Sequence, residues 1–379
     1  MKISNTYSWL EISAGALRHN ISAHRRLLPK KTKLMAVIKS NAYGHGLEQV
    51  VKVCEGSRPV DWYGVAYLDE AFKLRMLAKK TPILILSHYL PYNRALLAKA
   101  IKSHISFVVY EIGQIKALER ASRAADSPAR LHLKLETGMA RLGQFPEPAA
   151  KLLQLISKSK YLKLEGVASH FSTAEEANGF VKYQLQVLKD FIADNKKYIS
   201  KKVLQHISCT ASILTAPDTH LDMVRLGIGL YGLWPSAETH KKSKAGLAPV
   251  LAWKTTIIEI QKLPKGIVVG YGKSFITNKS IVMASIPVGY WEGYDRRLGN
   301  KGVVLIGGKR CPIIGRICMN LSMVDVSKVK GVKVGDEVVL IGRQGKAEVT
   351  ADEMAKKIDS INYEVVTCIN PQLPRILVK

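Results

Sequence analysis

Eight short apolar runs, rich in β-branched and aromatic residues, recur through the first two-thirds of this 379-residue sequence. Segments with helical apolar spacing lie between them, as at residues 71–77 and 112–118. Near-continuous apolar strands that alternate with helices are typical of a parallel sheet. Eight such units predict a (β/α)8 TIM-like barrel, and periodicity leaves a doubly wound open sheet as the alternative. The runs are 34–38, 63–67, 83–87, 105–109, 131–135, 165–169, 204–208 and 223–226.

The pattern changes after residues 234–249, a polar, proline-bounded stretch that we interpret as an interdomain linker. Beyond it, strand-like runs follow one another at short spacing and predict a mostly β domain. We expect one helix at 351–361, with Thr350 and Glu353 as a capping box. The sequence therefore predicts two domains, residues 1–240 and 241–379. The strand-like runs are 251–260, 281–288, 302–306, 311–314, 322–326 and 337–341.

The chain is strongly basic, with 57 Lys and Arg against 30 Asp and Glu, which raises the question of a polyanionic partner. The basic residues form short clusters that are not interleaved with aromatic side chains, so we expect no specific nucleic-acid partner. Five cysteines without a close CxxC pair argue against a zinc site and a disulfide framework. No apolar run is long enough for a membrane span or a signal peptide, and we expect a cytoplasmic protein without a membrane partner.

The first apolar run stops abruptly at Lys39, which small and turn-forming residues follow. A lysine at the end of a buried strand has its amine near apolar walls, and desolvation disfavours the ammonium form. Such an amine is a nucleophile that commonly attaches a carbonyl compound or pyridoxal phosphate. The alternative is a solvated lysine that merely ends a strand. Tyr43, followed by Gly44 and Gly46, favours the functional interpretation, because a hydroxyl beside a glycine-rich helix start can hold a phosphate.

Other polar residues also fall at the carboxyl ends of the predicted strands, where a barrel places its chemistry. Each of them has a structural alternative: a surface lysine, a helix cap, a satisfied core histidine, an N-cap, or an arginine paired with Asp222. The residues at issue are Lys134, Arg141, His170, Thr210 and Arg225.

The stretch Ala36-Val-Ile-Lys-Ser-Asn-Ala-Tyr-Gly-His-Gly46 resembles the pyridoxal-phosphate attachment motif of the alanine racemases. Residues 134–143 resemble the racemase segment that carries a carbamylated lysine and an active-site arginine. The resemblance continues in matching order to Tyr363, so it covers essentially the whole chain. It implies a pyridoxal-phosphate-dependent racemase with a (β/α)8 barrel and a β domain.

The resemblance also implies a role for each matching residue. Lys39 would carry the cofactor, Arg225 would donate to its pyridine nitrogen, and His170 would lie against the ring. Arg141 would contact the phenolic oxygen of the cofactor and the substrate carboxylate, and Lys134, as N6-carboxylysine, would hold Arg141. The residues implied to hold the phosphate are Tyr43, Thr210, Gly227 and Tyr363, and the backbone N–H of Met319 is implied to bind the substrate carboxylate.

Racemisation removes Hα from one face of the substrate and returns a proton to the other, which calls for two opposed bases. The resemblance assigns Lys39 to the face of D-alanine and Tyr290 to that of L-alanine. It implies a homodimer with shared active sites, in which the partner subunit supplies Tyr290 and Met319. Because an arginine does not readily give up its proton, Arg225 would leave the pyridine nitrogen unprotonated, which predicts a racemase rather than an aminotransferase. D-alanine for peptidoglycan is the implied product.

The sequence departs from the family pattern at four positions: Glu136, Cys209, Glu292 and Asn320. These departures bear on rate and substrate range more than on reaction type. The alternatives are a racemase of broader range, acting on serine or basic amino acids, and a non-catalytic protein that binds pyridoxal phosphate or polyanions. A decarboxylase is disfavoured, because that related class pairs the pyridine nitrogen with a carboxylate.

Overall fold

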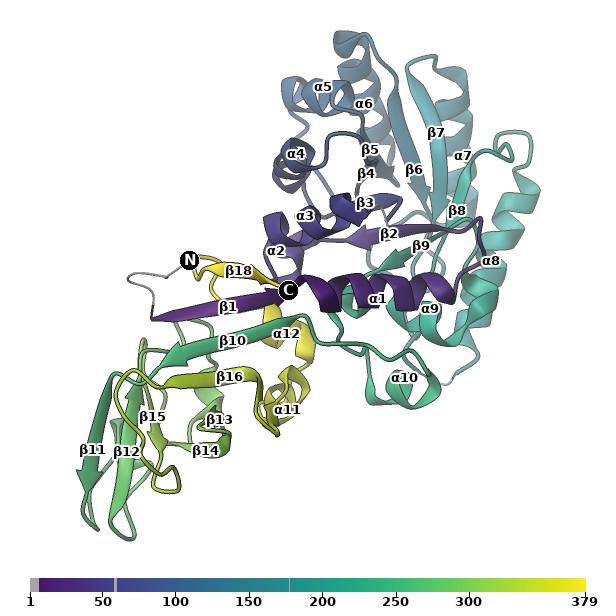
Figure 1. The fold of residues 1–379 in the computed structure, drawn as a ribbon. Coiled ribbons are helices and arrows are strands. Elements are labelled where there is room, and N and C mark those ends of the chain that lie inside the picture. The colour runs from purple at the N-terminus through teal and green to yellow at the C-terminus, as the bar shows by residue number, and fades with distance from the viewer. Residues whose placement is uncertain (1–6, 58–59, 177) are drawn as a thin grey trace. The chain divides into compact units, whose positions relative to one another are not determined.

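The structure is a computed structural model that describes residues 7–57, 60–176 and 178–379. Backbone contacts divide the chain into two units, both drawn in Figure 1. The α/β unit comprises Leu17–Ala42 and Val50–Ala248, and the β unit comprises Met1–Ala16, Tyr43–Gln49 and Pro249–Lys379. Within the described ranges, no helix has both the length and the apolar character that a membrane crossing requires.

The α/β unit is built on eight strands that pair in parallel in the order β8-β7-β6-β5-β4-β3-β2-β9. Backbone hydrogen bonds also link the two outermost strands, from Asp222 N to Gln205 O (3.1 Å) and from Arg225 N to Ser208 O (3.0 Å). The sheet is therefore a nearly closed barrel, which confirms the predicted (β/α)8 fold and excludes the open sheet. The strands are β2 (Lys33–Val37), β3 (Trp62–Val65), β4 (Ile83–Ile85), β5 (Ile105–Val109), β6 (Ala129–Lys134), β7 (Leu162–Ala168), β8 (Leu204–His206) and β9 (Met223–Leu226).

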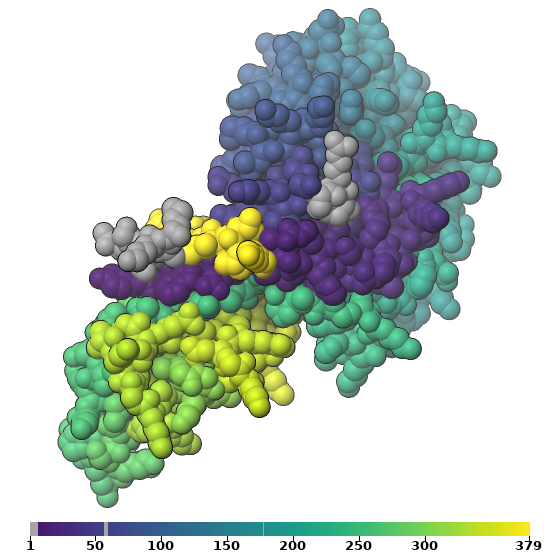
Figure 2. Space-filling model, in the orientation of Figure 1, coloured from purple at the N-terminus to yellow at the C-terminus, as the bar shows by residue number. Residues whose placement is uncertain are grey.

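Helices surround these strands in Figure 1, and α1 forms part of the surface of the unit on the face shown in Figure 2. The stretch predicted as a linker contains a short helix, because Ser236 accepts a hydrogen bond from Thr239 N (3.1 Å) and caps it. The helices are α1 (Ala14–Arg26), α3 (Leu47–Ser57), α4 (Leu68–Leu77), α5 (Arg94–Lys102), α6 (Ile112–Ala125), α7 (Pro146–Lys158), α8 (Phe180–Asp194), α9 (Thr210–Thr215) and α10 (Ala237–Lys242), with 3-10 turns at η1 (Pro217–Thr219) and η2 (Ile228–Tyr231).

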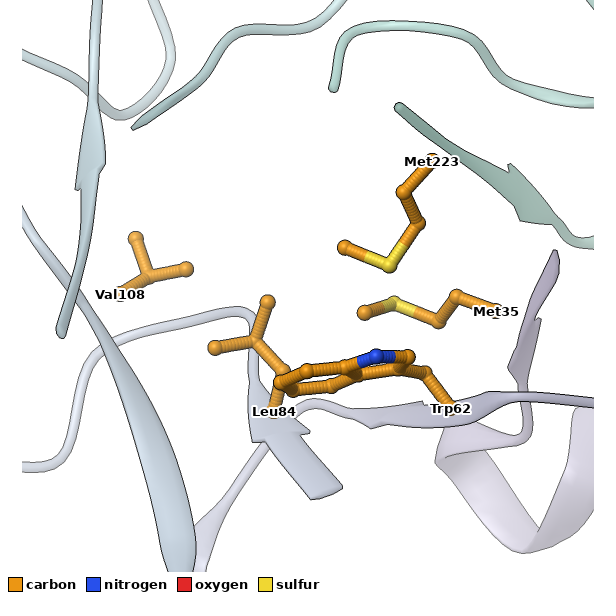
Figure 3. Close-up of a cluster of buried hydrophobic side chains, with 5 residues drawn as sticks. All are labelled: Met35, Trp62, Leu84, Val108 and Met223. Atoms are coloured by element: carbon orange, nitrogen blue, oxygen red, sulfur yellow. The ribbon is translucent and has the colours of Figure 1, made fainter. Parts of the chain in front are cut away.

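An apolar cluster fills part of the barrel interior (Figure 3). The thioether chains of Met35 and Met223 lie above the indole of Trp62, and Leu84 and Val108 complete the cluster. All five residues are buried, and they come from five different strands. Inward-facing side chains of this size make the barrel a packed core rather than a pore.

The β unit contains a second sheet, in which β1 (Ser8–Ser13) pairs antiparallel with β10 and parallel with β18. The run predicted as one strand at 251–260 is two strands, because the chain changes partner from β16 to β12 near Ile257. The remaining strands and turns are β10 (Leu251–Thr256), β11 (Glu259–Leu263), η3 (Tyr271–Lys273), β12 (Ile281–Ile286), η4 (Arg296–Leu298), β13 (Val303–Ile306), β14 (Lys309–Ile314), β15 (Ser322–Asp325), β16 (Glu337–Gln344), β17 (Ala347–Val349) and β18 (Arg375–Val378).

The predicted helix at 351–361 is shorter, α11 (Ala351–Lys357), and α12 (Asn362–Thr367) follows it. The Thr350 hydroxyl accepts a hydrogen bond from Glu353 N (3.0 Å), as expected of an N-cap. The second half of the predicted capping box is wrong: the Glu353 carboxylate pairs instead with Arg310 and with Lys357, which offer it full positive charges.

Candidate active site

Lys39 begins a left-handed turn, α2 (Lys39–Tyr43), at the carboxyl end of β2. Ser40, Asn41 and Ala42 have φ of 55°, 54° and 54°, and Tyr43 has φ of 53°. Left-handed backbone costs roughly 1 kcal/mol for each residue that has a Cβ. The protein maintains this conformation at four consecutive non-glycine residues, which marks the segment after Lys39 as a constrained site.

Burial, together with the nearby Arg141 guanidinium, holds the pKa of the Lys39 amine below its ordinary value, while Glu70 acts in the opposite direction. Glu70 also fixes the turn, because its carboxylate accepts hydrogen bonds from Ser40 N (2.5 Å) and Ala66 N (2.7 Å). The result is a half-buried amine on a fixed backbone, with a larger neutral fraction than a solvated lysine would have.

Two further cations lie in the same end of the barrel. Burial, with the nearby Arg225 and Arg141, lowers the pKa of Lys134 to about 8. Burial lowers the pKa of Arg225 itself to about 10. Lys134 thus lies in a strongly positive field, which favours a neutral amine or a modification that gives it negative charge.

Glu136 shapes the loop that carries Arg141. Its carboxylate accepts hydrogen bonds from the N–H groups of Gly138 and Met139, each at 2.5 Å. Burial raises the pKa of this carboxyl, but the backbone N–H groups outweigh burial and hold the pKa below its ordinary value. Glu136 is therefore an anion that fixes the loop conformation leading to Arg141.

Arg225 is almost fully buried in β9, and its donors are met by main-chain and imidazole acceptors. Its guanidinium donates to Ser169 O (2.6 Å), to Ile207 O (2.8 Å), to His170 Nδ1 (2.9 Å) and to His206 Nδ1 (2.7 Å). Burial and the surrounding cations hold the pKa of His170 well below its ordinary value, so this ring is a neutral acceptor.

The alternative pairing of Arg225 with Asp222 is wrong. Asp222 accepts a hydrogen bond from Gln205 N (2.9 Å) instead, and so satisfies the backbone at the start of β8. Sequence reasoning also missed His206 as a partner of Arg225. His206 lies in a predicted barrel strand, four residues before Thr210, and this position was the signal that could have indicated a role in the site.

Thr210 opens α9 beside a glycine turn. Its hydroxyl oxygen accepts hydrogen bonds from Gly227 N (3.0 Å) and Gly229 N (3.3 Å), so two backbone N–H groups converge on one point. A Cβ at Gly229 would lie 2.6 Å from Thr210 Cγ2 and 2.7 Å from His24 Nε2. Only glycine fits there, and the converging N–H groups beside a hydroxyl suit an oxyanion such as a phosphate.

The β unit brings together two other predicted residues, Tyr43 and Tyr363. Their ring centroids are 6.3 Å apart with an interplanar angle of 47°. Gly44 adjoins Tyr43 with φ of 81°, and a Cβ there would meet Val366 O at 2.0 Å. The turn at 43–44 is thus packed directly against α12, which carries Tyr363.

The same unit places the Tyr290 and Met319 segments side by side. Tyr290 N donates to Cys318 O (3.1 Å), and Trp291 N donates to Met319 O (2.9 Å). The side chains of Tyr290, Trp291 and Met319 are exposed by 43%, 56% and 56%. Three large exposed side chains on two adjacent segments are typical of a surface that another protein chain covers.

Comparison with known proteins gives one consistent result. The sequence profiles of the alanine racemase N-terminal domain and C-terminal domain match residues 12–235 and 250–377. Alanine racemase 1 of Caldanaerobacter subterraneus is 39% identical over 97% of this chain and 94% of its own length, and the alanine racemase of Leptospira interrogans is 37% identical over 99% and 97%.

Solved structures agree with the sequence relatives. The alanine racemase of Clostridium difficile 630 has a TM-score of 0.91 and 33% identity, over 99% of this chain and 96% of that one. The Bacillus anthracis alanine racemase with bound L-Ala-P has a TM-score of 0.90 and 30% identity, over 98% and 95%.

Proposed function

Because this chain belongs to the alanine racemase family, we propose that it interconverts L-alanine and D-alanine with pyridoxal phosphate as cofactor. The observation that carries this function is Lys39, a half-buried amine of lowered pKa on a left-handed turn at the carboxyl end of β2. A lysine in that state, in a barrel rich in cationic side chains, suits the attachment of an anionic aldehyde.

The residues of the α/β unit fit the cofactor. Thr210 and the N–H groups of Gly227 and Gly229 would hold its phosphate, and the close packing of Gly229 against Thr210 and His24 fixes that turn. Arg225 would donate to the pyridine nitrogen, and His170 would lie against the ring. When bound, pyridoxal phosphate withdraws electrons from the substrate and so makes Hα more acidic.

Two residues would move the proton. The Lys39 amine would take it from D-alanine and return it there, and the Tyr290 phenol would serve the face of L-alanine. Arg141 and the N–H of Met319 would orient the substrate carboxylate, because both are donors suited to an anion. Tyr43 and Tyr363, neighbours in the β unit, would add hydroxyl groups to the phosphate site.

We place Tyr290 and Met319 in the active site of a partner subunit, so that a homodimer shares two sites. Their exposure, and that of Trp291, supports this arrangement. In this scheme residues 1–240 supply most of the cofactor site, and residues 241–379 supply Tyr363 and the second base.

Lys134 is proposed to carry a carbamate. With a pKa of about 8, a substantial fraction of its amine is neutral, and a neutral amine adds carbon dioxide with loss of one proton. The negative charge of the carbamate would then lie near Arg141 and Arg225, and it would offset the repulsion between these two cations.

The test is exchange of Hα for deuterium in D2O, followed separately from L-alanine and D-alanine with added pyridoxal phosphate. We expect the wild type to exchange both isomers, Lys39→Ala to exchange neither, and Tyr290→Phe to lose mainly abstraction from L-alanine. If the wild type leaves alanine unchanged but racemises serine or lysine, racemisation stands as the reaction type and alanine is refuted as the substrate. A wild type that exchanges no amino acid would refute the proposed function.

A further inference from the structure

A row of polar side chains enters the barrel interior behind Arg225. It consists of His206 in β8, His132 in β6 and Glu165 in β7, and Ser106 in β5 joins it at the far end. Both histidines are fully buried, and the His132 ring lies at 73° to the indole of Trp62 with centroids 5.4 Å apart. The strands that supply this polar row thus meet the apolar cluster of Figure 3 inside the barrel.

The donors of Arg225 decide where the protons of this row lie. A guanidinium has only donors, so Nδ1 of His206, 2.7 Å from Nη1, must be an unprotonated acceptor. A neutral imidazole then carries its proton on Nε2. That nitrogen lies 2.9 Å from Nδ1 of His132, which must in turn accept.

The same reasoning extends to the end of the row. With Nδ1 as an acceptor, neutral His132 carries its proton on Nε2, and this atom lies 3.5 Å from Glu165 Oε2. A proton on Nδ1 of His132 would leave His206 with no proton on either nitrogen, which an imidazole does not tolerate at neutral pH. The two hydrogen bonds of the row therefore point the same way, from Arg225 to His206 and from His206 to His132. Beyond them the N–H of His132 faces the Glu165 carboxylate at 3.5 Å, an electrostatic contact longer than a hydrogen bond.

The row brings the negative charge of an unmodified side chain towards a buried cation. Among the described residues, no carboxylate forms an ion pair with Arg225, whose neighbours are carbonyls, imidazoles and other cations. The Glu165 carboxylate accepts a hydrogen bond from Ser106 Oγ (2.5 Å) and lies 3.9 Å from Arg130. The negative charge of Glu165 polarises the His132 ring from 3.5 Å, and the hydrogen bonds from His206 to His132 and from Arg225 to His206 polarise one another. The distant carboxylate therefore makes His206 Nδ1 a stronger acceptor for Arg225.

We propose that Glu165 and Ser106 are positioning residues for Arg225, acting through His132 and His206 to fix its guanidinium as a donor towards the reacting end of the barrel. The effect of these residues on catalysis rests on the proposed function. The placement of the protons rests on the geometry alone. Neither Glu165 nor Ser106 is required to touch substrate or cofactor.

The first test uses cofactor-free protein whose histidines are labelled with nitrogen-15, and reads the ring nitrogens by NMR near neutral pH. Because the chain has 10 histidines, the His132→Gln and His206→Gln variants assign the signals. We expect both rings to be neutral with the proton on Nε2. A doubly protonated ring, or a proton on Nδ1 of either ring, would overturn the proposed direction whether or not the protein racemises alanine.

The second test uses the loaded enzyme and Glu165→Gln, which keeps the shape and removes the charge. We expect kcat for alanine to fall about tenfold, the size that outer partners of charged ligands produce at metal sites, with KM changed less than about twofold. Pyruvate released per alanine racemised should fall, because a less firmly held guanidinium is a poorer donor to the pyridine nitrogen, and transamination depends on electron withdrawal by that ring more than racemisation does. Ser106→Ala should shift both values in the same direction by a smaller factor.

Glu119→Gln is the matched control, since Glu119 also accepts from a serine, Ser159 Oγ (2.8 Å), but lies outside the row. We expect it to match the wild type. If Glu165→Gln and Ser106→Ala both behave like this control in kcat and in pyruvate release, the positioning role is refuted. Melting temperatures of all variants separate this outcome from a loss of folded protein.

Discussion

Glu292 and Asn320 are hydrogen-bonded to each other, with Asn320 Nδ2 2.7 Å from Glu292 Oε1. The other carboxylate oxygen accepts from Gly289 N at 2.8 Å. Gly289 directly precedes Tyr290, and Asn320 directly follows Met319. One carboxylate therefore joins the two segments that the β unit is proposed to contribute to catalysis, and the resemblance to the family implies a departure at both positions.

Asn320→Asp is expected to lower kcat about tenfold near neutral pH. Aspartate keeps the shape of asparagine, so two carboxylates would then face each other. The loss should shrink on acidification, when the pair can share a proton. Glu292→Gln combined with Asn320→Asp should restore most of the rate, since the glutamine amide can donate to the aspartate while its carbonyl still accepts from Gly289 N. The measurement is kcat against pH for the wild type and the two variants. A double variant as slow as Asn320→Asp would count against the pairing.

His24 is buried against the Thr210 turn, with Nδ1 2.8 Å from Asn20 O and no partner for Nε2. Burial lowers its pKa to about 4. Since this folded value lies below the unfolded one, the unfolded chain binds more protons between about pH 6.5 and about pH 4, and His24 destabilises the fold as pH falls through that window.

His24→Leu should therefore raise the free energy of unfolding by about 1 kcal/mol near neutral pH, by removing an unsatisfied buried nitrogen. The advantage should grow to about 3 kcal/mol more at the acid end of the window. Urea unfolding at several pH values measures both effects. His19→Leu, on the exposed face of the same helix, is the control, and an equal pH dependence in the two variants would contradict the assignment.

Gly229→Ala is expected to weaken pyridoxal-phosphate binding by about tenfold, because the new methyl group would meet Thr210 and His24 at less than a normal contact distance and displace the phosphate turn. Gly246→Ala is the control, since nothing lies within 4 Å of a Cβ there. Titration of the cofactor-free protein, followed by absorbance, gives both affinities. Equal affinities in the two variants would show that the turn does not hold the phosphate.

Glu136→Gln should raise KM for alanine about tenfold while changing kcat less, because the loop that places Arg141 loses its anion but Lys39 keeps its surroundings. The carboxyl has a lowered pKa in the folded protein, so its contribution is fully present at neutral pH and is lost only on acidification below its ordinary range. Steady-state kinetics with L-alanine and with D-alanine measure the separate effects on KM and kcat. Glu147→Gln, an exposed change in α7, should leave KM unaltered.

The barrel could be predicted from sequence because its strands are continuous apolar runs, as at 105–109, and its site residues follow those runs directly. The strand β1 was missed although its residues alternate between buried and half-buried, with Leu10 and Ile12 inward. The pattern was present, but its partners, β10 and β18, lie more than two hundred residues away in the chain.

The side chains that support the site were harder to foresee. His132 lies two residues before Lys134 in one strand, so alternation alone places both on the same face. Its bond to His206 could not be anticipated, because it depends on the lateral order of strands in the closed sheet. The left-handed turn at 40–43 was also hidden, since serine, alanine and tyrosine rarely adopt that backbone, and asparagine ordinarily does so only as a single residue.

The chain passes between its two units four times, at residues 16–17, 42–43, 49–50 and 248–249. One of these passages, at 42–43, falls within the turn that starts at Lys39, and the next follows at 49–50. A single genetic crossover near residue 240 would consequently join β1 and residues 43–49 from one parent to the rest of a β unit from another. Recombination between distant relatives should therefore preserve the fold only where these short inserted segments are exchanged together with the C-terminal third.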